Sequence, residues 1–397
     1  MYNKSKVILG LVFSVLFFQY CSKSDSVIQP VTMYAAIKTA FGTNIDPDNL
    51  ANYSNQSIPT YITKDNTGTN IITNSKATLG RVLFYDKNLS IDNTAACASC
   101  HKQQFAFSDT ALASKGVSGG LTGRHSMRLI NARFAAETNF FWDERVASLE
   151  EQTTKPIQDH AEMGFSGLSG RPNLESLITK LKAIEYYKEL FKFVYGDVNI
   201  TEARMQECMA QFIRSIQSFD AKYDAGRLLV NNDGQNFPNF TAQENTGKDL
   251  FLSPAVFDAT GNRISGGLGC GGCHKAPEFD IDPNTRNNGI IGVLNGTGID
   301  ITNTRSASLR DLANANGIPN SPMMHTGALA TLQTVIGHYG TINIAPGNTR
   351  LDPRLRPNGF GQQLHLNATE VNAVIAFLKT LTGTNVYSNV KWGNPFL

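Results

Sequence analysis

Cysteine, histidine and tryptophan are scarce in this chain, whose 397 residues include six, seven and two of them respectively. Six cysteines are too few for disulfides to be the main support of so long a chain, which can bury a core without them. Strand-like alternation of apolar and polar residues is also rare, which disfavours an all-β fold. The net charge of +2 implies no polyanionic partner, so binding to nucleic acid is not indicated.

The chain also lacks an apolar run long enough to predict a transmembrane helix. Its strongest run, from Val7 to Phe18, follows two lysines and ends near Cys21. A charged start followed by a short apolar stretch is typical of a secretory signal. We therefore expect residues 1–21 to be a signal peptide for export to the periplasm. Cys21 is a candidate lipid-attachment site, and a lipid there would be the chain's only contact with a membrane.

Four of the six cysteines lie in two Cys-x-x-Cys-His motifs. These are Cys97-Ala98-Ser99-Cys100-His101 and Cys270-Gly271-Gly272-Cys273-His274. This pattern is typical of covalent haem attachment, in which two thiols form thioethers and the histidine ligates the iron. A single zinc held by both cysteine pairs would not need the two histidines. The sequence therefore predicts two covalently bound haem c groups, ligated by His101 and His274.

A weak internal repeat surrounds the two motifs. The segment 80–84 (Gly-Arg-Val-Leu-Phe) precedes the first motif, and 247–251 (Gly-Lys-Asp-Leu-Phe) precedes the second. Lysine, then phenylalanine and aspartate, follow each motif. We expect two copies of one c-type cytochrome domain, mainly α-helical with long loops and little β structure. The expected divisions are an N-terminal extension and linker (22–75), an N-terminal haem domain (76–225) and a C-terminal haem domain (226–397).

Helical periodicity supports this fold class. A helix capped by Thr201 is expected to bury Cys208 as a structural thiol on its apolar face. A second amphipathic helix is expected from Thr369 to Leu381, with Asn367 or Thr369 as its cap. Residues 64–75, rich in Asn and Thr, are expected to form a linker.

Two further blocks carry a family resemblance. Phe140-Phe141-Trp142-Asp143-Glu144-Arg145 precedes Gln152 and Glu162-Met163-Gly164, and Pro322-Met323-Met324-His325-Thr326-Gly327 follows the second motif. Together with both haem motifs, this order makes residues 76–382 resemble the bacterial di-haem cytochrome c peroxidase family, which includes MauG-like enzymes. Glu144 stands where the family commonly has glycine.

The resemblance implies roles for three residues between the motifs. Trp142 would lie between the two haems, and Gln152 and Glu162 would lie in the pocket over the N-terminal haem. Cleavage of peroxide needs a base for one oxygen and an acid for the other, and a carboxylate beside an open iron site can serve as both. The alternative for Trp142 is a tryptophan buried in the core, and the alternative for Glu162 is a solvated surface residue.

The resemblance also bears on the sixth ligand of the C-terminal haem. Family peroxidases usually have a methionine about fourteen residues after the histidine that matches His325, whereas MauG-like enzymes have a tyrosine there. Fourteen residues after His325 this chain has Tyr339. Met324 and His338 are rival candidates for the sixth ligand, and Tyr339 could instead be an ordinary tyrosine of the core. The loop 116–123, where many of these peroxidases hold a histidine over the iron, contains none.

Calcium is only weakly implied. His125 stands where the family has an asparagine that helps to bind calcium between the haems, and Asn320 and Pro322 would be the other partners.

These observations predict a di-haem peroxidase that reduces hydrogen peroxide with electrons from a small donor such as a cytochrome c. A MauG-like oxidase acting on a protein or small organic substrate is the second reading. A non-catalytic electron-transfer cytochrome is the third. Homodimers are common in the family, so the resemblance also allows a dimer.

Overall fold

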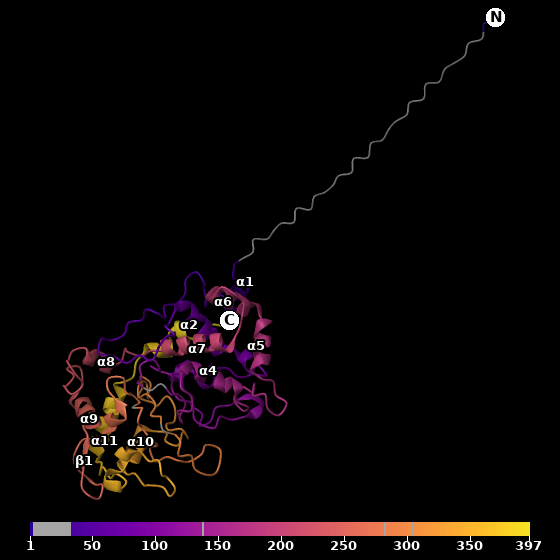
Figure 1. Cartoon of the computed structure of the whole chain (residues 1–397). Helices are drawn as coiled ribbons and strands as arrows, with labels where there is room; N and C mark the ends of the chain where they lie inside the picture. The colour runs from indigo at the N-terminus through magenta and orange to yellow at the C-terminus, as the bar shows by residue number, and fades with distance from the viewer. Residues whose placement is uncertain (3–32, 137–138, 282, 304) are drawn as a thin grey trace.

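The computed structural model describes residues 1–2, 33–136, 139–281, 283–303 and 305–397 (Figure 1). The predicted signal peptide and Cys21 therefore lie, apart from Met1 and Tyr2, outside the described residues. No helix in the described ranges is long and apolar enough to cross a membrane.

Helices dominate the described part of the chain, as the sequence predicted. The α-helices are α1 (Ala35–Phe41), α2 (Asn74–Tyr85), α3 (Cys97–Cys100), α4 (Leu149–Gln158), α5 (Leu174–Lys182), α6 (Glu185–Tyr195), α7 (Glu202–Ser215), α8 (Lys222–Arg227), α9 (Ala242–Leu252), α10 (Leu332–Gly340) and α11 (Ala368–Lys379). The strands are β1 (Ala255–Phe257), β2 (Arg263–Gly266), β3 (His274–Lys275) and β4 (Asp280–Ile281). β1 pairs with β2 and β3 with β4, both antiparallel.

The N-terminal half, which we call the first module, is built on the packing of α2 against α7, with α4 also against α7. Gly80 is the contact point of α2, because a Cβ there would lie 1.9 Å from the Cys208 carbonyl oxygen. Only glycine allows so close an approach of two backbones. The Thr201 side chain accepts a hydrogen bond from the Arg204 N–H, so the predicted cap of α7 is confirmed.

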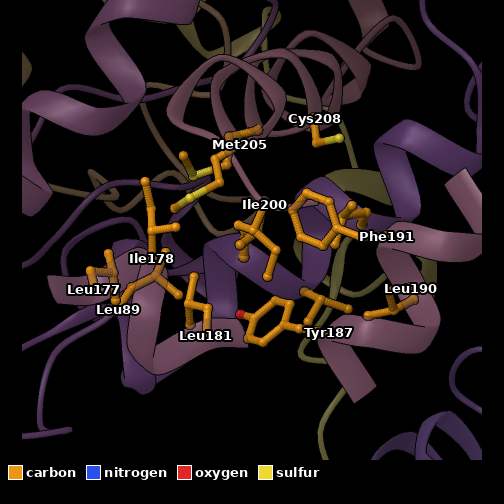
Figure 2. Packing of buried hydrophobic residues seen from close by; sticks show 14 of the residues in the cluster. Leu89, Leu177, Ile178, Leu181, Tyr187, Leu190, Phe191, Ile200, Met205 and Cys208 are labelled. Carbon is orange, nitrogen blue, oxygen red and sulfur yellow. The ribbon is translucent and has the colours of Figure 1, made fainter. Parts of the chain in front are cut away.

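The Cys208 side chain lies in a core to which α2, α5 and α6 also contribute (Figure 2). Its side chain is fully buried, as predicted, among Met205, Phe191 and other apolar residues. Burial raises the pKa of the thiol to about 12, so Cys208 is uncharged at neutral pH.

The second module, in the C-terminal half, repeats the crossing with α9 and α11. Gly247 takes the place of Gly80, because a Cβ there would lie 1.9 Å from the Ala373 carbonyl oxygen. α11 matches the predicted helix closely and is capped by Asn367, whose side chain accepts from the Glu370 N–H. In Figure 1 this pair of helices lies apart from α2 and α7, beside α10.

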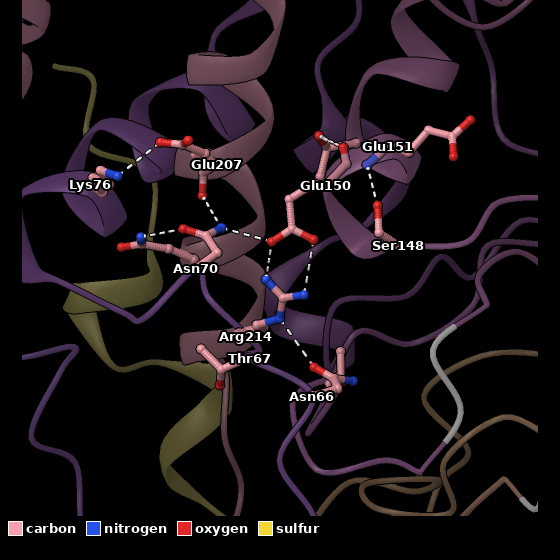
Figure 3. Close-up of polar contacts among 12 residues, drawn as sticks. Asn66, Thr67, Asn70, Lys76, Ser148, Glu150, Glu151, Glu207 and Arg214 are labelled. Carbon is pink, nitrogen blue, oxygen red and sulfur yellow. Dashed lines mark hydrogen bonds and ion pairs between the residues drawn. The ribbon is translucent and has the colours of Figure 1, made fainter.

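The segment predicted as a linker is held in place by a buried polar network (Figure 3). Arg214 of α7 forms a bidentate ion pair with Glu150 of α4, and its Nε donates to Asn66 Oδ1 at 3.1 Å. Asn70 Nδ2 donates to Glu150 Oε1 at 2.7 Å. Because these amides satisfy an ion pair between two helices, residues 66–70 form a fixed strap across the first module.

The C-terminal tail returns to the first module. Val386 and Trp392 belong to the apolar core that contains Phe84, and Trp392 is 2% exposed. Arg81 of α2 donates from Nε to the Gly393 carbonyl at 2.7 Å. Figure 1 shows the C-terminus beside α6. The last residues of the predicted C-terminal domain thus pack with the N-terminal half.

Candidate functional site

The first Cys-x-x-Cys-His motif forms the short helix α3 and the residue after it. Cys97 and Cys100 are unpaired and half-buried, one turn apart on the same helix. His101 Nδ1 lies 3.1 Å from the Phe107 carbonyl oxygen. Burial lowers the pKa of His101, so the ring is neutral and Nδ1–H donates to that carbonyl. Its Nε2 then carries the lone pair that an iron ligand needs.

The residues of both motifs fit covalent haem better than a shared zinc. Burial raises the pKa of Cys97 to about 12, of Cys100 to about 11 and of Cys270 to about 12. Zinc binds thiolates, which these environments disfavour. In the described ranges, no three His, Cys, Asp or Glu side chains come together as a metal-binding group.

Glu162 lies on a turn that follows α4. Asp159 Oδ1 accepts from the Ala161 N–H at 2.8 Å and from the Glu162 N–H at 2.9 Å, which shapes the turn. The histidine-free loop packs against it: Val117 N–H donates to the Glu162 carbonyl at 3.1 Å. A Cβ on Gly116 would lie 2.0 Å from the Ala161 carbonyl oxygen, so this contact requires glycine.

The Glu162 carboxyl has an unusual protonation equilibrium. Burial and, to a lesser extent, the charge of Asp159 raise its pKa to about 7, while Arg145 opposes the shift. The carboxylate in turn raises the pKa of both Cys97 and Cys100. The structure therefore places Glu162 near the first motif, in a form that can hold or release a proton at neutral pH.

Gln152 lies half-buried in the middle of α4. Its backbone N–H donates to the Ser148 carbonyl at 3.1 Å, as the helix requires. Gln152 and Glu162 thus come from one helix and the turn that follows it.

The second motif opens into a cavity of about 670 Å³, lined by Cys270, Cys273, His274 and Tyr339 among others. This volume lies within the usual range for cofactor sites. Burial and, to a lesser extent, the charge of Arg128 lower the pKa of His274 to about 4, so the ring is neutral and can ligate iron. The thiols, the neutral histidine and the enclosing apolar wall fit a haem here.

Two of the three candidate sixth ligands share one hydrogen-bond donor in this cavity. Asn288 Nδ2 donates to Tyr339 Oη at 3.2 Å and to Met324 Sδ at 3.0 Å. Tyr339 and Met324 both line the cavity. His338 instead bonds through Nε2 to the Asn288 carbonyl oxygen at 2.9 Å, and it does not line the cavity as described.

Trp142 also lines this cavity. Its Nε1–H donates to the His125 carbonyl at 2.8 Å, and its ring meets that of His325 edge-on at 6.3 Å. His125 also lies close enough to His101 to lower its pKa. Trp142 and His125 therefore connect the surroundings of the first motif with the cavity of the second.

Two of the partners expected for calcium hydrogen-bond to other groups. Asn320 Nδ2 donates to the Asp311 carbonyl and to Tyr387 Oη, both at 2.8 Å. His125 Nδ1 lies 3.0 Å from the Ala111 carbonyl oxygen, and burial lowers the pKa of the ring.

Sequence reasoning missed Asn288, Arg128 and Arg305, all of which line the second cavity. The internal repeat does not mark the two arginines, because when 125–131 is set against 305–311, Arg128 matches Ser308 and Arg305 matches His125. No motif marks Asn288.

The fold and the paired motifs define a mainly helical protein with two related modules, each presenting residues that fit a c-type haem. A family model described as di-haem cytochrome c peroxidase matches residues 74–231. Methylamine utilization protein MauG of Methylophilus methylotrophus is 30% identical over 79% of this chain and 84% of its own. Cytochrome c551 peroxidase of Nitrosomonas europaea is 25% identical over 77% of this chain and 80% of its own. The chain belongs to the di-haem cytochrome c peroxidase family that includes MauG.

Solved structures agree. A MauG-like protein associated with microbial copper homeostasis has 26% identity and a TM-score of 0.64, covering 86% of this chain and 99% of its own. The di-haem peroxidase BthA of Burkholderia thailandensis, at 18% identity, shares the fold with a TM-score of 0.59 over 88% of this chain and 92% of its own. The chain is therefore an oxidoreductase of a haem-dependent family.

Proposed function

We propose that this protein is a di-haem peroxidase that reduces hydrogen peroxide with electrons from a small donor such as a cytochrome c. The observation that carries the proposal is Glu162, a carboxyl with a pKa of about 7 beside the thiols of the first haem motif. A group that titrates near neutral pH can accept a proton from peroxide and then return it.

Haem c bound at Cys97 and Cys100 would supply a redox-active iron, with His101 as its proximal ligand. The Phe107 carbonyl holds the His101 ring in the tautomer that offers Nε2. Ionised Glu162 would take a proton from one oxygen of hydrogen peroxide and give it to the other, which leaves as water. Gln152 would orient peroxide by hydrogen bonding.

The second module would store and deliver electrons, with its haem on Cys270, Cys273 and His274. Trp142 would carry electrons between the modules, because its indole joins His125 to the second cavity. Tyr339, together with His274, would hold the iron of this haem as its sixth ligand.

Export and partners follow from the same chemistry. The sequence of residues 1–21 and the attachment of haem c outside the bacterial cytoplasm support a periplasmic location, with Cys21 as a lipid anchor. A cytochrome c there would be a suitable donor, and a homodimer is the proposed assembly.

A second candidate is a MauG-like oxidase that oxidises a protein or small organic substrate. Tyr339 favours it, because a phenolate stabilises oxidised iron, and so does the 30% identity to a MauG protein. The third reading, an electron carrier, has no use for a carboxyl whose pKa is raised as that of Glu162 is.

Steady-state kinetics of the holoprotein test these alternatives. With hydrogen peroxide and reduced cytochrome c, we expect turnover without prior reduction, because the loop 116–123 contains no histidine to block the first site. Resting protein should give the electron paramagnetic resonance (EPR) signal of one high-spin haem. Two low-spin haems and no peroxide consumption with any donor would leave only the electron carrier.

A further inference from the structure

Asn288 occupies a central position in the second cavity that the family resemblance does not explain. Its main chain is fixed by His338, whose Nε2 donates to the Asn288 carbonyl at 2.9 Å. Because a carbonyl oxygen can only accept a hydrogen bond, Nε2 carries the proton of this bond. Asn288 is thus tied to α10, the helix that also carries Tyr339.

The side-chain amide is oriented as well. Asn288 Oδ1 accepts from the Ile290 N–H at 3.1 Å, which identifies the oxygen and leaves Nδ2 to point the other way. Nδ2 has two hydrogens, and it donates to Tyr339 Oη at 3.2 Å and to Met324 Sδ at 3.0 Å. One amide therefore uses both of its donors on two side chains that can each ligate iron.

Met324 reaches this amide from a strained backbone. Its φ is +73°, a region that non-glycine residues rarely adopt. Strain of this kind persists only where surrounding contacts hold it, and it concentrates at functional sites. The backbone of Met324 is closed into a turn by the Gly327 N–H, which donates to its carbonyl at 3.0 Å.

We propose that Asn288 is a positioning residue that selects the sixth ligand of the second haem. Its amide steadies the Tyr339 hydroxyl toward the cavity and holds Met324 aside, in reserve. The inference rests on the proposed haem ligation and adds that the choice between a tyrosine and a methionine ligand is made by a third side chain.

The test is spectroscopy of the holoprotein, with the first haem as an internal reference. In Asn288→Leu, which keeps the size but removes both donors, we expect the single EPR signal of the second haem to split into two populations. Its reduction potential should rise, because methionine ligation raises the potential of haem iron. Asn288→Gln should restore part of the wild-type signal. If the leucine variant loses haem, Asn288→Ser serves in its place.

Asn348→Ala is the matched control. The Asn348 side chain pairs with the neighbouring Asn287, with Nδ2 to Oδ1 distances of 2.8 Å in both directions, so its loss loosens the same loop without touching Tyr339. We expect an unchanged second haem. An identical effect of Asn348→Ala and Asn288→Leu, or no effect of Asn288→Leu, would refute the selecting role.

Tyr339→Phe separates this inference from the ligand assignment on which it depends. We expect Met324 to take over, with a higher potential of one haem only. An unchanged second haem in this variant would contradict Tyr339 ligation itself. A changed haem there, together with a silent Asn288→Leu, would contradict only the role of Asn288.

Discussion

The two modules share a scaffold down to individual side chains. Each has a phenylalanine on the first helix, one after the haem motif and one on the second helix, with ring centroids 5.2 and 6.0 Å apart in the first module and 5.3 and 5.9 Å in the second. These are Phe84, Phe107 and Phe212, and Phe251, Phe279 and Phe377.

The likeness extends beyond the aromatic trio. Asn131 (φ +56°) and Asp311 (φ +53°) each donate from the backbone N–H to a carbonyl just beyond the second helix, at 3.0 Å to Ile216 and 3.2 Å to Leu381. The modules differ in what the segments between their paired helices bring to the haem motif. The first receives the carboxyl of Glu162 from a turn, and the second receives Met324 from a turn and Tyr339 from α10. A common frame can thus carry two different tasks, because the distinguishing residues lie outside the paired helices.

Loss of the Glu162 carboxylate should have the largest effect that is confined to one module. Glu162→Gln removes the proton acceptor, so kcat/KM for peroxide should fall by about 10²–10⁴-fold. In the wild type, kcat/KM should rise with pH and level off above about 7, since the carboxyl must lose its proton to act as a base. The variant should lose this dependence. Stopped-flow kinetics over this pH range provide the measurement.

Glu151→Gln is the control, because this carboxylate pairs with Lys155 on the surface of α4. Its kinetics should match the wild type. The second haem should keep its spectrum in both variants. A Glu162→Gln enzyme with full activity would remove the distinction between the modules.

Trp392 tests whether the tail belongs to the first module. Trp392→Ala empties a site that is 2% exposed, which should lower the free energy of unfolding by about 3–5 kcal/mol. Hydrogen exchange followed by mass spectrometry should show opening of α2 and α7, with α9 and α11 still protected. Val390→Ala, on the same tail but 81% exposed, should change nothing. Equal opening of both modules would contradict the assignment.

The two glycine crossings should respond alike. Gly80→Ala and Gly247→Ala each place a methyl group against a backbone carbonyl, which should cost about 1–3 kcal/mol, each in its own module. Thermal unfolding measures the loss, and hydrogen exchange locates it. Gly337→Ala on α10, where a Cβ would meet nothing within 4 Å, should leave stability unchanged or raise it by up to ~1 kcal/mol. If Gly247→Ala left the stability unchanged, the helices of the second module would be packed less closely than those of the first.

Local signals in the sequence were enough for the helical class and for several elements. Thr201 caps α7 because its side chain accepts from the Arg204 N–H, and this contact joins residues only three positions apart. The linker prediction for 64–75 missed the strap because Asn66 and Asn70 owe their order to Glu150 and Arg214, far along the chain. Composition cannot report such contacts.

The candidate site divides in the same way. Cys97, Cys100 and His101 lie within five consecutive residues, so the sequence alone predicts them as a haem motif. The contact of Asn288 with Tyr339 appears only in the structure, where a loop meets α10. The roles of Glu162, Gln152, Trp142 and Tyr339 stay predictions. The structure adds the raised pKa of Glu162 and the shared amide of Tyr339 and Met324.

The returning tail has a consequence for how the protein is made. A chain is synthesised from its N-terminus, so residues 74–215 are made long before Trp392. The first module cannot complete its core until Val386 and Trp392 have been made. Until then the first Cys-x-x-Cys-His motif belongs to an incompletely packed module. Closure of that module would thus follow the synthesis of both motifs.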